Sequence, residues 1–211
     1  MRGYVGPLLG LAAGVGCVSV NGHREATPVA PGQVEALAAA GGFYESEAGW
    51  PAPLSALGVR VGIASGIDVG AVLGPVQLRL DATFRLVEAG PLTLSLSPAV
   101  AAGALGLESS ENLSAFFTAD ASLLATIGSP RVRGTVFVGP GVGFIPPQEG
   151  REGVTGFLIR QGGGVRFWVL PRFGLHPEAV VTTDAGQGYA VVDAAFSLGF
   201  VLRFGDLETG S

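Results

Sequence analysis

Apolar and polar residues alternate along much of this chain with a period of two. The clearest example spans residues 76–87, where Leu78 and Leu80 are flanked by Gln77 and Arg79. Because successive side chains of a β-strand point to opposite faces, this pattern predicts a strand with one oily face and one charged face. Residues 91–101 repeat the pattern, and a Glu-Ala-Gly turn that starts at Glu88 joins the two segments as a hairpin.

The same alternation recurs along the body of the chain and predicts about ten strands, with eight as the alternative count. The predicted strands cover residues 34–44, 54–63, 67–73, 76–87, 91–101, 117–126, 132–138, 157–169, 173–182 and 192–204. Most of them have the roughly 9 to 11 residues that a tilted transmembrane strand needs. After the N-terminus, no apolar run reaches the length of about 18 residues expected for a spanning helix.

The lengths of the connections indicate how the strands are arranged. Tight turns are predicted at residues 64–66, 88–90, 128–131 and 170–172, after even-numbered strands. Longer connections begin at Glu45, Leu105 and Ile145, after odd-numbered strands, and only Gly74 and Pro75 break the rule. This parity is typical of a closed, antiparallel, up-and-down transmembrane β-barrel, in which an even strand count returns the chain to its starting side.

Composition supports an all-β membrane protein and disfavours a nucleic-acid-binding one. Charged residues make up 14% of the chain and the mean hydropathy is +0.49, although no long apolar run is present. A transmembrane barrel produces this combination, because alternate residues face lipid and a polar interior. The net charge of −5, with no basic stripe, argues against a nucleic-acid partner.

The alternating strands, their parity and the closing Arg203-Phe204 pair resemble those of small bacterial outer-membrane β-barrel proteins. This resemblance covers residues 34–204 and implies an outer-membrane location, contact with outer-membrane lipid, and recognition of the last strand by the machinery that assembles such barrels. A small solute or anion is a further candidate partner, because arginines are in mild excess on the predicted inner face.

The N-terminus is predicted to contain an export signal. Arg2, an apolar stretch and small residues before Cys17 have the layout of such a signal over residues 1–17. The segment also resembles a loose lipoprotein box, which implies lipidation of Cys17; an ordinary signal peptide is the alternative. Residues 18–33 are polar and proline-bearing and predict a linker, followed by the barrel domain at 34–205 and a short tail at 206–211.

The polar face of the predicted strands collects charged residues of both signs. In a barrel of about ten strands the lumen is narrow, so we expect these residues to interlock as a charge-paired network rather than to line an open channel. The network is predicted to contain Arg60, Asp68, Arg79, Asp81, Arg85, Asp120, Arg133, Arg160, Arg166, Glu178, Asp193 and Arg203.

Candidate catalytic residues are few. Of the two histidines, His23 falls in the predicted linker and His176 on a predicted strand. Some outer-membrane barrels are lipid-modifying enzymes that pair histidine with serine, so His176 with Ser95 or Ser197 is a low-ranked candidate for a lipid hydrolase or acyltransferase. No histidine, cysteine and carboxylate cluster occurs at metal-ligand spacing, so we expect no metal site and no cofactor.

Three functional hypotheses follow. The first is a non-enzymatic integral outer-membrane barrel with a structural, adhesive or narrow-pore role. The second is a lipid-anchored periplasmic barrel, similar to lipocalins, that binds an apolar ligand. The third is an outer-membrane enzyme. The scarcity of charge on the face that alternates with the aliphatic one favours the first, because a water-facing exterior would be more highly charged.

Overall fold

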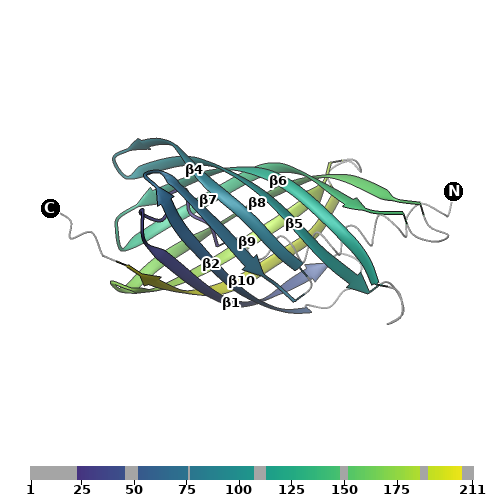
Figure 1. Cartoon of the computed structure of the whole chain (residues 1–211), viewed down its shortest axis with the longest axis horizontal. Coiled ribbons are helices and arrows are strands. Elements are labelled where there is room, and N and C mark those ends of the chain that lie inside the picture. The colour runs from purple at the N-terminus through teal and green to yellow at the C-terminus, as the bar shows by residue number, and fades with distance from the viewer. Residues whose placement is uncertain are drawn as a thin grey trace.

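The computed structural model describes residues 23–45, 52–75, 77–106, 113–147, 152–185 and 190–205. They form an all-β structure of ten antiparallel strands that closes into one barrel (Figure 1). The strands are β1 (Val34–Glu45), β2 (Ala52–Ala64), β3 (Ile67–Leu73), β4 (Gln77–Ala89), β5 (Leu92–Gly106), β6 (Leu113–Gly128), β7 (Val132–Ile145), β8 (Val154–Leu170), β9 (Phe173–Asp184) and β10 (Ala190–Phe204). No helix among these residues is long and apolar enough to span a membrane.

The barrel is an up-and-down meander closed by its first and last strands. Each strand pairs with its neighbours in sequence, and β1 pairs with both β2 and β10. Val34 lies opposite Phe204 across this closing seam, so β1 begins and β10 ends at the same rim. The predicted closed barrel of ten strands is therefore confirmed, and the alternative of eight strands is excluded.

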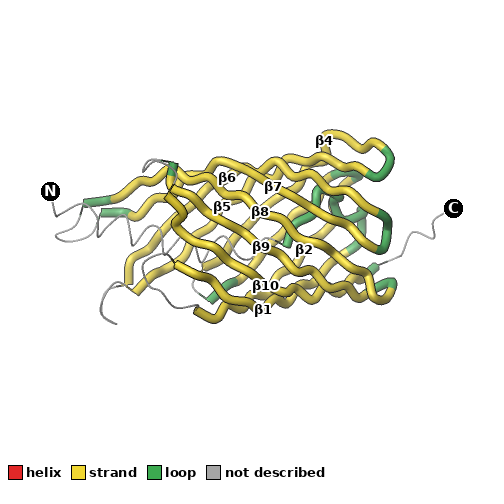
Figure 2. The backbone as a smooth tube through the Cα atoms, turned by 180° about the vertical axis from the view of Figure 1, so that it is seen from behind, coloured by secondary structure: helices red, strands yellow, loops and turns green. Residues whose placement is uncertain are grey.

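The two rims differ in the lengths of their connections, as the parity of the sequence predicts. The tight turns after β2, β4, β6 and β8 gather at the rim where β10 ends (Figure 2). Gly66 and Gly90 adopt positive φ angles of 80° and 58° in the first two of these turns, a conformation that glycine reaches without steric cost. Longer connections follow β1, β5, β7 and β9, and the short link between β3 and β4 is the exception.

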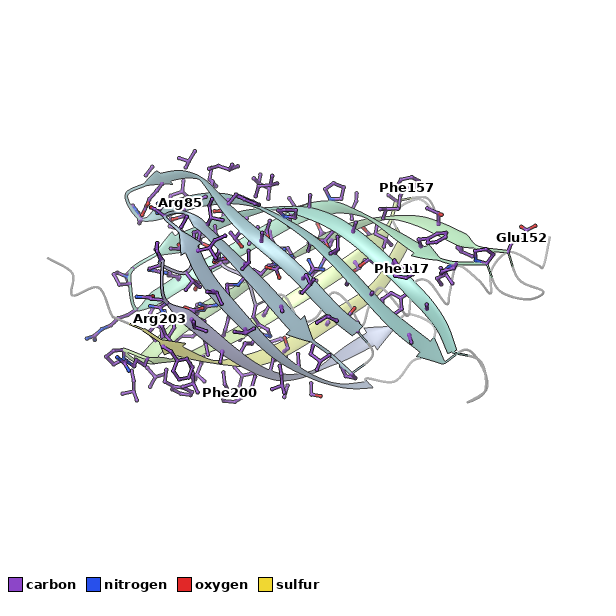
Figure 3. All side chains as sticks on the ribbon, viewed as in Figure 1. Arg85, Phe117, Glu152, Phe157, Phe200 and Arg203 are labelled. Carbon is purple, nitrogen blue, oxygen red and sulfur yellow. The ribbon has the colours of Figure 1, made fainter. Side chains whose placement is uncertain are left out.

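The alternating pattern places apolar side chains outside the barrel and most polar ones inside. On β4, Gln77, Arg79 and Asp81 are buried, whereas Leu78 and Leu80 are exposed. Figure 3 shows apolar side chains projecting outward over much of the barrel wall, Phe117, Phe157 and Phe200 among them. The face that the sequence assigns to the lumen is therefore the buried one.

The described part of the predicted linker lies inside the barrel. His23, Arg24, Glu25 and Ala26 are buried in the lumen. From there the chain runs to the rim where β1 starts, and the Gly32 amide donates to the Gly62 carbonyl oxygen at 3.1 Å. The segment has no alternation because it is not a strand, yet its polar groups find partners on the inner barrel wall.

Backbone hydrogen bonds fix this segment, here called the N-terminal plug (residues 23–33), to the wall. The Ala26 amide donates to Thr126 Oγ1 at 2.8 Å, and the Val29 amide donates to Asp68 Oδ2 at 2.8 Å. Ser95 Oγ donates to the Ala26 carbonyl oxygen. Inward-facing hydroxyl and carboxylate groups thus satisfy backbone groups that a buried loop would otherwise leave unpaired.

The lumen also contains apolar layers. Phe116, Ile145, Leu158 and Ala101 form a buried cluster toward the rim with longer connections. A second cluster joins Ala26 of the plug to inward residues of three strands, namely Leu124, Phe137 and Val180. The interior is therefore packed by side chains of both kinds.

Candidate functional site in the barrel lumen

A group of ion pairs lies where β2, β3 and β4 meet. Arg60 pairs with both Asp68 and Asp81, and its Nη1 donates to Thr83 Oγ1 at 3.0 Å. A Cβ atom on Gly70 would lie 2.9 Å from Arg60 Nη2, so glycine makes room for the guanidinium. Because Asp68 also accepts from the Val29 amide, this group contacts the plug as well as the wall.

A second group bridges β4 and β6. Arg79 pairs with Asp120 through both terminal nitrogens: Nη2 donates to Oδ1 at 2.9 Å, and Nη1 lies 2.8 Å from Oδ2. Arg24 of the plug approaches the same carboxylate at 3.9 Å and donates to Ser97 Oγ at 2.8 Å. One carboxylate thus faces two arginines, of which one comes from the plug.

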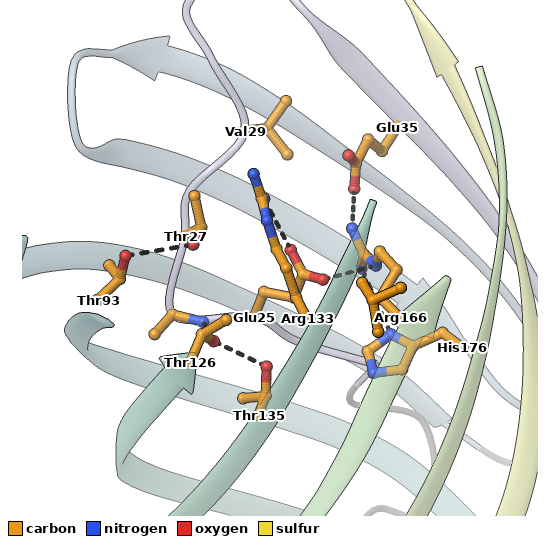
Figure 4. Close-up of polar contacts among 12 residues, drawn as sticks. Glu25, Thr27, Val29, Glu35, Thr93, Thr126, Arg133, Thr135, Arg166 and His176 are labelled. Carbon is orange, nitrogen blue, oxygen red and sulfur yellow. Dashed lines mark hydrogen bonds and ion pairs between the residues drawn. The ribbon is translucent and has the colours of Figure 1, made fainter. Parts of the chain in front are cut away.

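A third group ties the plug to β1, β7, β8 and β10 (Figure 4). Arg166 contacts Glu25 at 3.1 Å and Glu35 at 2.8 Å, and its Nη2 donates to the His23 carbonyl oxygen at 3.1 Å. Glu35 also pairs with Arg203 at 2.6 Å, and Glu25 pairs with Arg133 at 3.4 Å. Here three arginines share two carboxylates.

The predicted lumen network corresponds closely to these groups. The structure brings these predicted residues into ion pairs inside the barrel: Arg60, Asp68, Arg79, Asp81, Asp120, Arg133, Arg166 and Arg203. Arg160 and Glu178 are buried in the lumen, and Arg160 lies 5.5 Å from the Phe137 ring centre. Arg85 instead pairs with Glu88 beside the tight turn after β4, where both are partly exposed, and the Asp193 side chain is outside the described residues.

Sequence reasoning missed three members of the network, Arg24, Glu25 and Glu35. The first two lie in the plug, where no strand periodicity marks their direction. Glu35 did carry a signal, because it lies two residues before Leu37 and four before Ala39 on the inward face of β1. The predicted lipidation site Cys17 and the tail at 206–211 lie outside the described residues.

Both histidines of the chain meet in the lumen. The His23 and His176 ring centres are 5.1 Å apart with the ring planes at 73°, and Glu178 completes the cluster. His23 Nε2 contacts Ser197 Oγ at 3.0 Å, whereas His176 Nδ1 lies 3.4 Å from Arg166 Nη2. Burial lowers the pKa of His23 below its usual value of 6.5, because a buried site disfavours the charged form of the ring.

The serines named as partners of His176 are engaged elsewhere. Ser95 donates to the plug backbone at Ala26, and Ser197 contacts His23. His23, His176 and Glu178, by contrast, come together only in the folded chain. The sequence did not predict this cluster, because His23 and His176 are far apart along it.

Comparisons with protein-family models and with curated proteins find no match for this chain. Solved structures with a similar outline include Neisserial surface protein A, at 14% identity and TM-score 0.42, covering 82% of this chain and 96% of that one. The attachment invasion locus protein Ail of Yersinia pestis gives 14% identity and TM-score 0.45, covering 82% and 99%. The NanC porin gives 7% identity and TM-score 0.46, covering 80% and 100%. These similarities assign neither a ligand nor an activity to this chain.

Proposed function

We propose that this protein is an integral outer-membrane barrel with a closed lumen, serving a structural or adhesive role rather than conducting solutes. The observation that carries the proposal is the plug, whose charged side chains are buried in the lumen and paired with the barrel wall. A membrane role requires an apolar exterior, and a non-conducting role requires a filled interior.

The exterior fits a lipid environment. Large apolar side chains project from most strands, with Phe157 65% exposed and Val136 64% exposed. Soluble monomers rarely display apolar surface on this scale, because contiguous patches beyond a few hundred Å² promote association. Nine of the strands have 12 to 17 residues, more than the roughly 9 to 11 that cross the hydrocarbon core.

The polarity of the two faces argues against the lipocalin-like alternative. A soluble carrier of an apolar ligand needs an apolar cavity inside and a charged surface outside. In this barrel, Arg79, Asp81, Arg166 and Glu178 are among the most buried residues. An apolar ligand in such an interior would separate ion pairs and leave their charges unpaired, which is strongly unfavourable.

The interior is too closely packed for a wide aqueous path through the region of the plug. One cavity there, lined by His23, Glu35, Arg60, Arg166 and Val201, measures about 30 Å³. By this measure one water occupies about 10–15 Å³, so the cavity holds about two waters. Arginines that could otherwise attract anions form ion pairs with Glu25, Glu35 and Asp120. We expect the assembly machinery for such barrels to act on β10, which ends at Phe204.

Two measurements test this proposal. In outer-membrane fractions, a Cys17→Ala variant should resist extraction by urea or carbonate and should keep a heat-modifiable gel mobility. Its release into the soluble fraction would contradict an integral barrel and favour a lipid-anchored one.

In planar bilayers, the unmodified barrel should show no steady ion current, whereas a deletion of residues 23–33 should create one. An Arg85→Ala variant is the matched control, because it removes a charge at the rim without touching the plug. A steady current through the unmodified protein, unchanged by the deletion, would show that the plug does not close the lumen.

A further inference from the structure

The cluster of His23, His176 and Glu178 has features that the ion-pair network does not explain. Their side chains are almost completely inaccessible, with residue exposures of 3%, 0% and 2%. His176 and Glu178 are two residues apart on β9 and therefore point to the same side of the wall, while His23 faces them from the plug. The chain contains only these two histidines, and the fold brings both to one place.

On each side chain, one atom that could bind a metal lacks a hydrogen-bond partner. These atoms are His23 Nδ1, His176 Nε2 and Glu178 Oε1, all buried. Buried polar atoms are nearly always paired, so three unpaired ones in a single cluster need a physical explanation. Ligand atoms of the three side chains all lie within 4.8 Å of one another.

The far side of each ring is occupied, which fixes how the rings are turned. His23 Nε2 contacts Ser197 Oγ at 3.0 Å, so Nε2 can donate its hydrogen there while Nδ1 keeps a lone pair toward the cluster. His176 Nδ1 faces Arg166 Nη2 at 3.4 Å. The Ser197 contact orients the His23 ring in the way that is usual for histidines that bind metals.

Glycines on both neighbouring strands leave space at the two free nitrogens. A Cβ atom on Gly164 of β8 would lie 2.7 Å from His176 Nε2, and one on Gly199 of β10 would lie 2.8 Å from His23 Nδ1. Real Cβ atoms essentially never approach other atoms so closely. Any other residue at these positions would therefore crowd the nitrogens that face the cluster.

We propose that His23 Nδ1, His176 Nε2 and Glu178 Oε1 bind a divalent transition-metal ion, with Zn²⁺ as the best match. Two imidazoles and one carboxylate are a donor set that Zn²⁺ favours, with water in the fourth position. At Zn–ligand distances of about 2.0–2.1 Å, tetrahedral geometry places the donor atoms about 3.4 Å apart. Ligand atoms of the three side chains lie within 4.8 Å of one another, and metal binding would draw them closer together.

Binding also requires a change in the hydrogen position on His176. Arginine can only donate, so the Arg166 contact places the ring proton on Nε2 when no metal is bound. When Nε2 takes the metal, this proton moves to Nδ1 and the 3.4 Å contact is given up. Arg166 keeps its shorter bonds to Glu35 and to the His23 carbonyl oxygen, and the carboxylates of Glu25 and Glu35 offset its charge near the ion.

The ion would clip the plug to β9, because His23 belongs to the plug and the other two ligands belong to the wall. Binding to the folded state alone raises stability by mass action. Zinc should therefore raise the thermal unfolding temperature of the barrel in detergent, and chelation should reverse the rise.

Calorimetric titration of the tag-free, chelator-treated full chain with ZnCl₂ tests the site. One ion should bind per chain, and His23→Gln, His176→Gln and Glu178→Gln should each weaken binding at least tenfold. Asp81→Asn is the matched control, since it alters a buried lumen carboxylate that pairs with Arg60 of the wall and is not a ligand, and it should leave zinc affinity unchanged. No stoichiometric binding, or binding that the ligand variants do not weaken, overturns the proposal.

A second readout does not depend on the variants folding. Imidazole ¹⁵N spectra of the unmodified protein contain signals from only two histidines. Zinc should shift the Nδ1 resonance of one ring and the Nε2 resonance of the other, and bound Co²⁺ should give the visible absorption of tetrahedral coordination. Histidine spectra that stay unchanged at saturating zinc would overturn the proposal. The heat-modifiable gel mobility of the metal-free protein tests the membrane barrel separately from the metal site.

Discussion

Removing one arginine from the lumen should reveal how strongly the buried ion pairs hold the barrel together. In an Arg79→Met variant, the aliphatic stem is retained but both bonds to Asp120, at 2.8 Å and 2.9 Å, are lost. The Arg79 side chain is 0% exposed and that of Asp120 is 8% exposed, so water cannot replace the missing partner. Arg24, at 3.9 Å, and Ser122 Oγ, at 3.4 Å, remain beside the carboxylate.

Breaking a buried pair from one side costs about 3–5 kcal/mol, because it leaves an uncompensated charge. We place Arg79→Met near 3 kcal/mol, at the low end of about 3–5, because Arg24 still neutralises part of the Asp120 charge. Asp120→Asn should cost more, since it deprives two arginines of one acceptor. The double variant should be more stable than the sum of the single losses predicts, by roughly 1–3 kcal/mol.

Urea unfolding from lipid vesicles, followed by tryptophan fluorescence, measures these free energies. Arg85→Ala is the comparison variant, because its partly exposed pair with Glu88 should contribute only about 0.2–1 kcal/mol. If Arg79→Met were no more destabilising than Arg85→Ala, or if the two lumen variants were simply additive, the buried network would not be what stabilises the interior.

Two further predictions concern the outer wall and the histidine cluster. Val138→Arg, at the middle of β7 and 49% exposed, should make insertion and folding less favourable by about 2–4 kcal/mol, whereas Val132→Arg at the strand end should cost only about 0–1 kcal/mol. Equal losses in a vesicle folding assay would contradict a lipid-facing wall. Ser197→Ala should weaken zinc binding about tenfold by removing the contact to His23 Nε2; unchanged affinity by calorimetry would show that this contact does not orient the ring.

The strands were predictable because a period of two is a strong local signal. On β4 the predicted inward positions Gln77, Arg79 and Asp81 are buried, and the predicted boundaries of β3 match the observed Ile67–Leu73. Other strands are longer than predicted. β7 continues through Gly139 and Gly141 to Ile145, because glycines weaken the alternation without ending the strand.

The plug and the histidine cluster were not predictable for the same physical reason. A short polar segment without periodicity has the same pattern whether it lies in water or inside a polar lumen, so residues 23–33 gave no sign of their burial. The cluster depends on that placement, because His23 reaches His176 only when the plug enters the barrel. Phe116 is 1% exposed inside the lumen, because its neighbour Phe117 faces outward and successive strand residues point to opposite faces.

A scan of single labels along β7 in lipid vesicles tests the central claim most directly. In a Cys17→Ala background, cysteines placed at Val136, Phe137 and Val138 would carry a fluorophore, and lipids brominated in their acyl chains would quench it. A lipid-facing outer wall should give strong quenching at 136 and 138 and little at 137, whose native side chain faces the lumen. Equal quenching at all three positions, or none at any, would contradict a membrane-spanning barrel with a filled interior.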